Sequence, residues 1–225
     1  MKRVVIHPDY MCFSGFIDRL PEIFHNEGKT LFKERNEIKL IKHHDLEFVV
    51  KSFKKPHLIN QLAYTTIRAS KAKRAYLHAL ILKEKAILTP TPVAYIEIIK
   101  FGLLFNSYFV AQKSRFDREI RTLIIDPDLP EADLILTDLA RFTADIHQKG
   151  VFHKDYSSRN ILFGKVGVHY EFELVDLNRM KFCEIDLESG CKNLNRLCFN
   201  DDMYRFFINA YVTARNVNVG HTLLT

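Results

Sequence analysis

The sequence lacks the long apolar run that a membrane-spanning helix requires. Such a helix needs about 18 uninterrupted apolar residues, and the best candidate runs are broken by Lys100, Asn106 or Asp133. Near the N-terminus, polar residues and a proline at positions 7–9 end the apolar run after three residues, which leaves no core for a signal peptide. We therefore expect a cytoplasmic protein that does not cross a membrane.

Cysteine is also scarce, and its spacing argues against two common roles. No two cysteines form a C-x-x-C pair and no histidine-rich segment lies beside them, so a zinc site is not expected. A disulfide framework is not expected either, because we recognise no export signal. We expect free, reduced thiols at all four positions, Cys12, Cys183, Cys191 and Cys198.

The composition is that of a folded soluble domain. The chain has 225 residues, of which 47% are hydrophobic and 27% charged, which excludes a disordered or collagen-like chain. Its net charge of +6 is uneven, with +8 in residues 1–100 and −2 in residues 101–225. Residues 51–85 hold nine Lys or Arg and a single acid, Glu84. This basic segment favours phosphates or an anionic membrane surface, although a solvated helix face explains the individual lysines equally well.

Hydrophobic periodicity in the first half predicts strands around one helix. The order is β-β-β-α-β-β, at residues 28–32, 38–43, 46–53, 70–85, 93–99 and 103–112. Ser70 is suited to cap the start of the helix. Pro90 and Pro92 end the helical segment, because proline and the residue before it avoid helical geometry.

The second half is dominated by one amphipathic helix. We expect this helix to have Pro130 in its first turn and to stop at Gly150. Its buried stripe has the spacing 4, 3, 4 and consists of Ile135, Leu139, Phe142 and Ile146. Two short strands at 161–163 and 170–175 and a helical segment at 189–214 are expected to follow.

Two short segments carry the pattern of a phosphotransferase. Residues 152–163 contain H-x-D-x-x-x-x-N, entered from a helix and left by a strand, and residues 174–179 place Asp176 at the end of a second strand. Kinase-like enzymes carry their catalytic loop and metal-binding aspartate in this order. We therefore predict an α+β, bilobal protein-kinase-like fold. Residues 1–112 form an antiparallel sheet with one helix that binds nucleotide, and residues 113–225 form a mainly helical lobe with the catalytic loop and metal site.

The expected roles follow from the chemistry of phosphoryl transfer, which needs an aligned hydroxyl and neutralised phosphates more than covalent work by the protein. Asp155 is the expected catalytic base for the attacking hydroxyl. Asn160 and Asp176 are the expected ligands of Mg²⁺, because this hard cation prefers amide and carboxylate oxygens. Lys51, which follows two valines on a strand, is expected to bind the α and β phosphates of ATP.

Four further residues have weaker assignments. His153 is expected to support the loop rather than to take part in catalysis. Lys33 and Arg35, in the turn between the first two strands, occupy the place of a phosphate-covering loop and are candidates for binding ATP, although exposed turn residues are the default. Arg159 is either a contact for an anionic substrate or an ordinary solvated arginine.

The chain resembles the Kdo/WaaP lipopolysaccharide kinase family over most of its length. The resemblance lies in residues 36–38, 49–54, 70–74, 89–92, 108–109, 153–160 and 175–179. It implies a bacterial kinase, dependent on ATP and Mg²⁺, that phosphorylates a sugar hydroxyl of Kdo or heptose in the lipid A and inner-core precursor. The expected location is the cytoplasmic side of the inner membrane. The expected partners are a sugar or glycolipid acceptor and, peripherally, an anionic membrane surface, with no nucleic acid.

Departures from the kinase pattern leave alternatives open. No G-x-G-x-x-G precedes the second strand, where only Gly28 is available. No acidic residue lies between Ser70 and Lys83, so the helix carboxylate that normally pairs with the strand lysine is missing. These losses favour a pseudokinase-like binding module, whereas the retained catalytic residues oppose it. A soluble small-molecule kinase of the aminoglycoside or choline type also shares the loop. Ser157, where protein kinases usually carry lysine, favours a compact acceptor such as a sugar.

Overall fold

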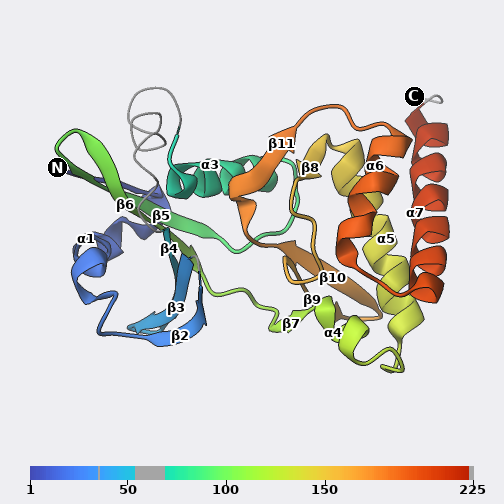
Figure 1. The fold of residues 1–225 in the computed structure, drawn as a ribbon, viewed down its shortest axis with the longest axis horizontal. Coiled ribbons are helices and arrows are strands. Elements are labelled where there is room, and N and C mark those ends of the chain that lie inside the picture. The colour runs from blue at the N-terminus through green and yellow to red at the C-terminus, as the bar shows by residue number, and fades with distance from the viewer. Residues whose placement is uncertain (35, 54–68, 223–225) are drawn as a thin grey trace. The chain divides into compact units, whose positions relative to one another are not determined.

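The computed structural model describes residues 1–34, 36–53 and 69–222. The chain divides into two compact units, each with its own core (Figure 1). Unit 1 consists of Met1–Glu84 and Pro90–Ser114, and unit 2 consists of Lys85–Thr89 and Arg115–Thr225. Among the described helices, none is both long enough and apolar enough to cross a bilayer.

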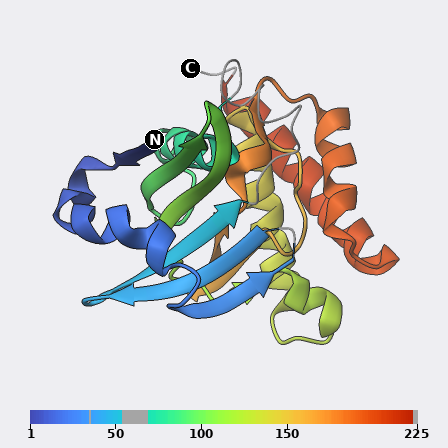
Figure 2. The ribbon, with the colours of Figure 1, turned by 60° about the vertical axis from the view of Figure 1, so that its left-hand side comes forward.

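Unit 1 is built on a six-stranded antiparallel sheet in the order β1-β5-β6-β4-β3-β2 (Figure 2). Its strands are β1 (Lys2–Ile6), β2 (Lys29–Lys33), β3 (Asn36–His43), β4 (Leu46–Phe53), β5 (Pro92–Lys100) and β6 (Leu103–Gln112). The five predicted strands are confirmed, with small shifts at their ends. The unpredicted β1 pairs with β5, from Lys2 opposite Ile98 to Ile6 opposite Ala94. Its apolar run of three residues is too short to identify a strand without knowledge of this partner.

Helix α1 (Ser14–Ile23) covers one face of this sheet. It follows a short 3₁₀ helix, η1 (Pro8–Phe13), and contributes apolar side chains to the core with the strands, namely Phe16, Ile17 and Leu20. The sequence does not predict α1, because Gly15 and Pro21 lie inside it and both residues disfavour a helix interior. Burial of its apolar stripe against the sheet overrides these local preferences.

Helix α3 (Lys71–Glu84) covers the opposite face (Figure 1). The predicted cap is confirmed, since the backbone N–H of Lys73 donates to Oγ of Ser70 at 3.1 Å. The second core cluster of unit 1 lies between α3 and the strands and contains Phe53, Ala72, Tyr76 and Tyr95. Lys51 is two residues before Phe53 on β4, and side chains alternate along a strand, so Lys51 shares the face covered by α3.

Unit 2 contains the predicted amphipathic helix α5 (Ala132–Gln148), which packs beside α7 (Asp201–Thr222) (Figure 1). The helix begins after Pro130 rather than with it, because Glu131 adopts a left-handed φ of 66°. Its predicted stop is confirmed, since Gly150 has a φ of 72° that an L side chain rarely adopts.

The predicted helical segment at 189–214 is confirmed for most of its length, but it is not continuous. The structure has α6 (Leu187–Leu194), a short 3₁₀ helix η3 (Asn195–Leu197) and then α7. The break lies at Cys198, whose φ is 58°, and at Asn200, whose side chain accepts a hydrogen bond from the backbone of Met203 at 2.9 Å and so caps α7.

Short strands in unit 2 bring together the loop before β9 and the loop after β10. The remaining elements are β7 (Arg118–Glu119), α4 (Arg121–Ile125), β8 (Val151–His153), β9 (Ile161–Val166), β10 (His169–Leu174), η2 (Leu177–Arg179) and β11 (Met180–Phe182). β10, β9 and β7 form one sheet, and β11 pairs with β8 in another. In the predicted β9–β10 hairpin, Ile161 lies opposite Leu174. The residues just before β9 and just after β10 are therefore neighbours.

Candidate functional site

The loop between β8 and β9 holds Asp155 and Asn160 in a compact, hydrogen-bonded turn. The carbonyl oxygen of Asp155 accepts from the backbone N–H of Ser157 at 2.8 Å and from Nδ2 of Asn160 at 2.9 Å. The backbone N–H of Asn160 donates to the carbonyl of Ser157 at 2.9 Å. Because the amide nitrogen of Asn160 is used inside the loop, its Oδ1 atom is the part of the side chain suited to bind a cation.

Val175 connects this loop to Asp176. Its backbone N–H donates to the carbonyl of Asn160 at 3.0 Å, and its carbonyl accepts from Nε2 of His153 at 3.0 Å. Both polar groups of the residue before Asp176 are thus held, one by Asn160 and the other by His153. Asp155, Asn160 and Asp176 consequently belong to one hydrogen-bonded frame within unit 2.

His153 has the contacts of a positioning residue. It is fully buried, and while Nε2–H donates to Val175, Nδ1 accepts from the backbone N–H of Asp155 at 3.1 Å. Burial lowers the pKa of His153, and the hydrogen bond to Val175 and the carboxylates of Asp176 and Asp155 only partly oppose that effect. A neutral ring with its proton on Nε2 satisfies both contacts. These contacts favour the support role for His153, which stays a prediction.

Asp176 is held in an unusual backbone conformation. Its φ of 56° and ψ of 50° place it in the left-handed region, where a residue with a Cβ atom has a strained backbone. The side chain of Asn178 donates from Nδ2 to Oδ1 of Asp176. Strain of this kind is concentrated at functional sites, where the surrounding structure fixes a carboxylate in a required direction.

Two arginines flank the carboxylate of Asp155. Nη1 of Arg179 lies 3.6 Å from one carboxylate oxygen, and Nη1 of Arg196 lies 3.8 Å from the other. The arginine side chains are 61% and 54% exposed, so much of each guanidinium surface remains available. Sequence reasoning assigned no role to either arginine. Arg179 belongs to the segment 175–179 that shares the family resemblance, whereas no sequence motif surrounds Arg196.

Further contacts anchor the loop to the body of unit 2. Tyr156 is fully buried, and its hydroxyl lies 2.7 Å from Oγ1 of Thr143 on α5. Burial raises the pKa of Tyr156 well above its usual value, so it stays a neutral hydrogen-bonding group. From α6, Nδ2 of Asn193 donates to the carbonyl of His153 at 3.3 Å.

The other residues predicted from the sequence are not all part of this frame. Arg159 is exposed in the same loop, whereas Lys51 and Lys33 belong to unit 1. Nζ of Lys51 lies 5.4 Å from the ring centre of Phe53. Lys33 is largely exposed at the end of β2, and its Nζ lies 3.4 Å from a carboxylate oxygen of Glu37. Arg35 lies outside the described residues.

The departures from the kinase pattern have structural counterparts. Neither Glu84 nor Glu97 replaces the missing helix carboxylate that would pair with Lys51. Glu84, the one acid in α3, is exposed in the last turn. Glu97 is buried on β5 and pairs with Arg3 at 3.0 Å. Gly28 has a φ of 82°, and a Cβ atom there would lie 2.6 Å from the carbonyl oxygen of Leu40. Close packing of β2 against β3 therefore explains Gly28 without a phosphate-binding role.

The oxygen donors of the frame suit a magnesium ion held jointly by protein and phosphates. In the described part of the chain, no group of three or more His, Cys, Asp or Glu side chains could bind a metal by itself. Mg²⁺ in nucleotide-dependent enzymes is usually bound by one or two side-chain oxygens together with substrate phosphates. Asn160 and Asp176 provide a donor set of that size.

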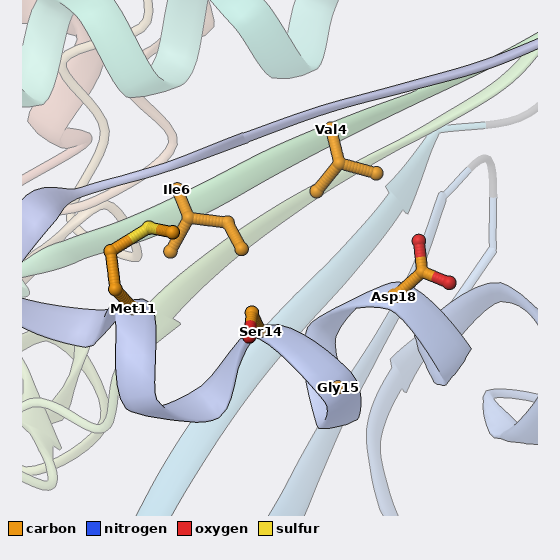
Figure 3. Close-up of a pocket in the computed structure, with 6 residues that line it drawn as sticks. All are labelled: Val4, Ile6, Met11, Ser14, Gly15 and Asp18. Carbon is orange, nitrogen blue, oxygen red and sulfur yellow. The ribbon is translucent and has the colours of Figure 1, made fainter.

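A separate hollow lies in unit 1 between β1 and the η1–α1 segment (Figure 3). Val4 and Ile6 of β1 face Met11 and Ser14 across it. The lining residues are Val4, Ile6, Met11, Ser14, Gly15 and Asp18, and none of them was predicted as a site residue. The mostly apolar lining includes no basic side chain.

The fold is also found in solved structures. A structure of WaaP in complex with acyl carrier protein has a TM-score of 0.65 and 17% identity, and the match covers 96% of this chain and 91% of that one. A crystal structure of WbdD has a TM-score of 0.52 and 11% identity, and the match covers 84% of this chain and 45% of that one. No curated protein sequence matches the chain.

These similarities place the chain in the class of protein-kinase-like folds, as the sequence predicts. The sequence model of the Kdo/WaaP lipopolysaccharide kinase family matches residues 57–218, which is more than half of the chain. The chain belongs to the Kdo/WaaP lipopolysaccharide kinase family. It is therefore a kinase of lipopolysaccharide synthesis.

Proposed function

We propose that the enzyme transfers the γ-phosphoryl group of ATP to a sugar hydroxyl, of Kdo or heptose, in the lipid A and inner-core precursor. The main support is the hydrogen-bonded frame that ties Asp155, Asn160 and Asp176 together through Val175. A binding module has no need for three such groups on one frame. The proposal includes a cytoplasmic location with peripheral attachment to the inner membrane.

In this proposal Asp155 orients the acceptor hydroxyl and accepts its proton. The new oxygen–phosphorus bond forms as the bond from the γ phosphorus to the bridging oxygen breaks and ADP leaves. Asn160 Oδ1 and the carboxylate of Asp176 would hold Mg²⁺, and the ion would neutralise charge on the phosphates. His153 positions both halves of the frame through its two ring nitrogens. In the same proposal Lys51 binds the α and β phosphates, and Lys33 and Arg35 are further candidates for binding ATP.

The acceptor that best fits the surroundings of Asp155 is Kdo. Arg179 and Arg196 bring two positive charges to the place where the acceptor hydroxyl must lie. Kdo carries a carboxylate, whereas heptose is neutral. Arginine forms strong charge-assisted hydrogen bonds to carboxylates, so the pair favours an acidic sugar over a neutral one.

A panel of acceptors tests the proposed reaction. The enzyme is incubated with labelled ATP and Mg²⁺ and with lipid A precursors that carry Kdo, that carry Kdo and heptose, or that carry neither sugar. Aminoglycosides and choline are included as soluble acceptors. Transfer that requires the Kdo or heptose residue supports the proposal. Transfer to a soluble amino sugar or to choline alone would instead identify a small-molecule kinase.

Replacing Asp176 by asparagine is expected to weaken Mg²⁺-dependent ATP binding about tenfold, because a neutral amide is a poorer ligand for a hard cation than a carboxylate. Thermal stabilisation by ATP, measured with and without Mg²⁺, reports this change directly. Asp128→Asn makes the same replacement at an exposed position of unit 2 and is the control. If MgATP stabilises Asp176→Asn at the same concentrations at which it stabilises the wild type, Asp176 is not a ligand of the metal.

The double replacement Arg179→Gln with Arg196→Gln is expected to raise KM for the Kdo acceptor about tenfold and to leave KM for ATP unchanged, because it removes the partners of the sugar carboxylate. Lys181→Gln, which removes an exposed cation on β11, is the control. An acceptor whose carboxylate has been converted to an amide should bind both enzymes equally. If the double variant keeps the wild-type KM for the acidic acceptor, the arginines do not recognise it.

A further inference from the structure

The turn between β5 and β6 presents an aromatic side chain to solvent. Phe101 retains 101% of its reference surface, the highest value among the large hydrophobic residues in the described ranges. It lies between Lys100, the last residue of β5, and Gly102. A Cβ atom added at Gly102 would have no neighbour within 4 Å, so the turn projects away from the body of unit 1.

The backbone at Phe101 is unfavourable for a phenylalanine. Its φ is 52°, and Gly102 follows with a φ of 72°. Turns of this kind between antiparallel strands favour glycine, asparagine or aspartate, because other residues are strained at positive φ. Glycine or asparagine at position 101 would relieve both the strain and the exposed apolar surface. The fold of unit 1 therefore gives no reason for an aromatic residue here.

Other apolar side chains lie near the same end of the sheet. Phe105 on β6 is 39% exposed, and Nζ of Lys100 lies 4.4 Å from its ring centre. Met1 is also exposed, and its carbonyl oxygen accepts from the backbone N–H of Ile99 at 2.8 Å, which fixes it beside the hairpin (Figure 1). We call the group of Met1, Lys100, Phe101 and Phe105 the hairpin tip.

We propose that the hairpin tip inserts into the interface of an anionic phospholipid bilayer. Exposed aromatic and apolar side chains with a lysine among them have the composition of an interfacial anchor, in which the rings enter the headgroup region and the amine stays at the phosphates. Anionic lipid is the chosen partner because the hairpin tip contains Lys100. In addition, the net charge of +8 in residues 1–100, which is carried by residues 51–85, attracts the protein to a negative surface. The proposal does not depend on the identity of the acceptor.

The absence of tryptophan from the sequence allows a direct test. The substitution Phe101→Trp introduces a single fluorescent reporter at the hairpin tip. Its emission is expected to shift to the blue in the presence of phosphatidylglycerol vesicles and to be quenched when their acyl chains carry bromine. Phosphatidylcholine vesicles should produce neither change. Val168→Trp is the matched control, because Val168 is 75% exposed in the β9–β10 turn of unit 2.

A second variant separates membrane binding from folding. Phe101→Gly is compatible with the positive φ and is expected to lower co-sedimentation with phosphatidylglycerol vesicles at least tenfold, while its thermal midpoint stays at or above that of the wild type. The proposal is overturned if anionic vesicles leave the reporter emission unchanged, or if Phe101→Gly co-sediments as the wild type does. A blue shift that appears without lipid as protein concentration rises would also overturn it, since that result indicates contact between copies of the chain.

Discussion

The Asp155→Asn enzyme is expected to bind MgATP as the wild type does and to transfer phosphate about a thousandfold more slowly, since general base catalysis contributes roughly this factor. Asparagine has the shape of aspartate but cannot accept the proton of the hydroxyl. The loop should keep its form, because Ser157 and Asn160 bind the backbone carbonyl of residue 155 and not its carboxylate. The loss should therefore fall on kcat.

Single-turnover transfer to the Kdo acceptor measures the rate, and thermal stabilisation by MgATP measures the retained nucleotide binding. Asp128→Asn, at an exposed position of the same unit, should keep wild-type values in both assays. If Asp155→Asn turns over normally, Asp155 is not the base. If it loses nucleotide binding along with turnover, the proposal that Asp155 acts as the base while Asp176 supports nucleotide binding is wrong.

The frame around Asp155 was accessible from the sequence because its contacts are local or are enforced by a hairpin. The spacing H-x-D-x-x-x-x-N lets Asn160 turn back to the carbonyl of Asp155 across five residues. The β9–β10 hairpin sets Ile161 opposite Leu174, so that Asn160 and Val175 become hydrogen-bonding neighbours by register. Neither contact requires knowledge of the rest of the fold.

Other features depend on contacts between distant segments and left no local pattern. Arg196, on η3, lies close to Asp155 although the two residues are far apart in the sequence. Strand β1 is recognisable through its pairing with β5, and α1 through the burial of its apolar face despite Gly15 and Pro21. In each case tertiary packing outweighs a weak or contrary local signal.

A buried histidine connects α5 to α7 and leads to the second large expected effect. His147 on α5 is 1% exposed, and its Nδ1 lies 2.8 Å from the hydroxyl of Tyr211 on α7. Burial lowers the pKa of His147 to about 4, the charge of Arg215 acts in the same direction, and Asn193 on α6 opposes the shift. Burial also raises the pKa of Tyr211 to about 12, so its hydroxyl stays neutral.

The direction of the pH effect follows from where the proton binds. An unfolded histidine has a pKa of about 6.5, whereas the folded value is about 4. Between these values the unfolded chain binds a proton that the folded protein does not, so acid favours unfolding. Lowering the pH from about 6.5 to about 4 should therefore reduce the free energy of unfolding by about 3 kcal/mol from this group alone.

Urea unfolding at a series of pH values measures this dependence, and His147→Gln isolates the contribution of His147. Glutamine can still accept from Tyr211 but does not titrate, so the variant should lose a slope of about 1.4 kcal/mol per pH unit within the window. His25→Gln makes the same replacement at an exposed position and is the control. The quantity to compare is the difference between the wild-type and His147→Gln curves. Protonation of buried His153 and of the carboxylates also lowers the free energy of unfolding in acid, and this contribution is common to both proteins. Equal slopes for the wild type and His147→Gln would mean that the contact of α5 with α7 tolerates a charged ring.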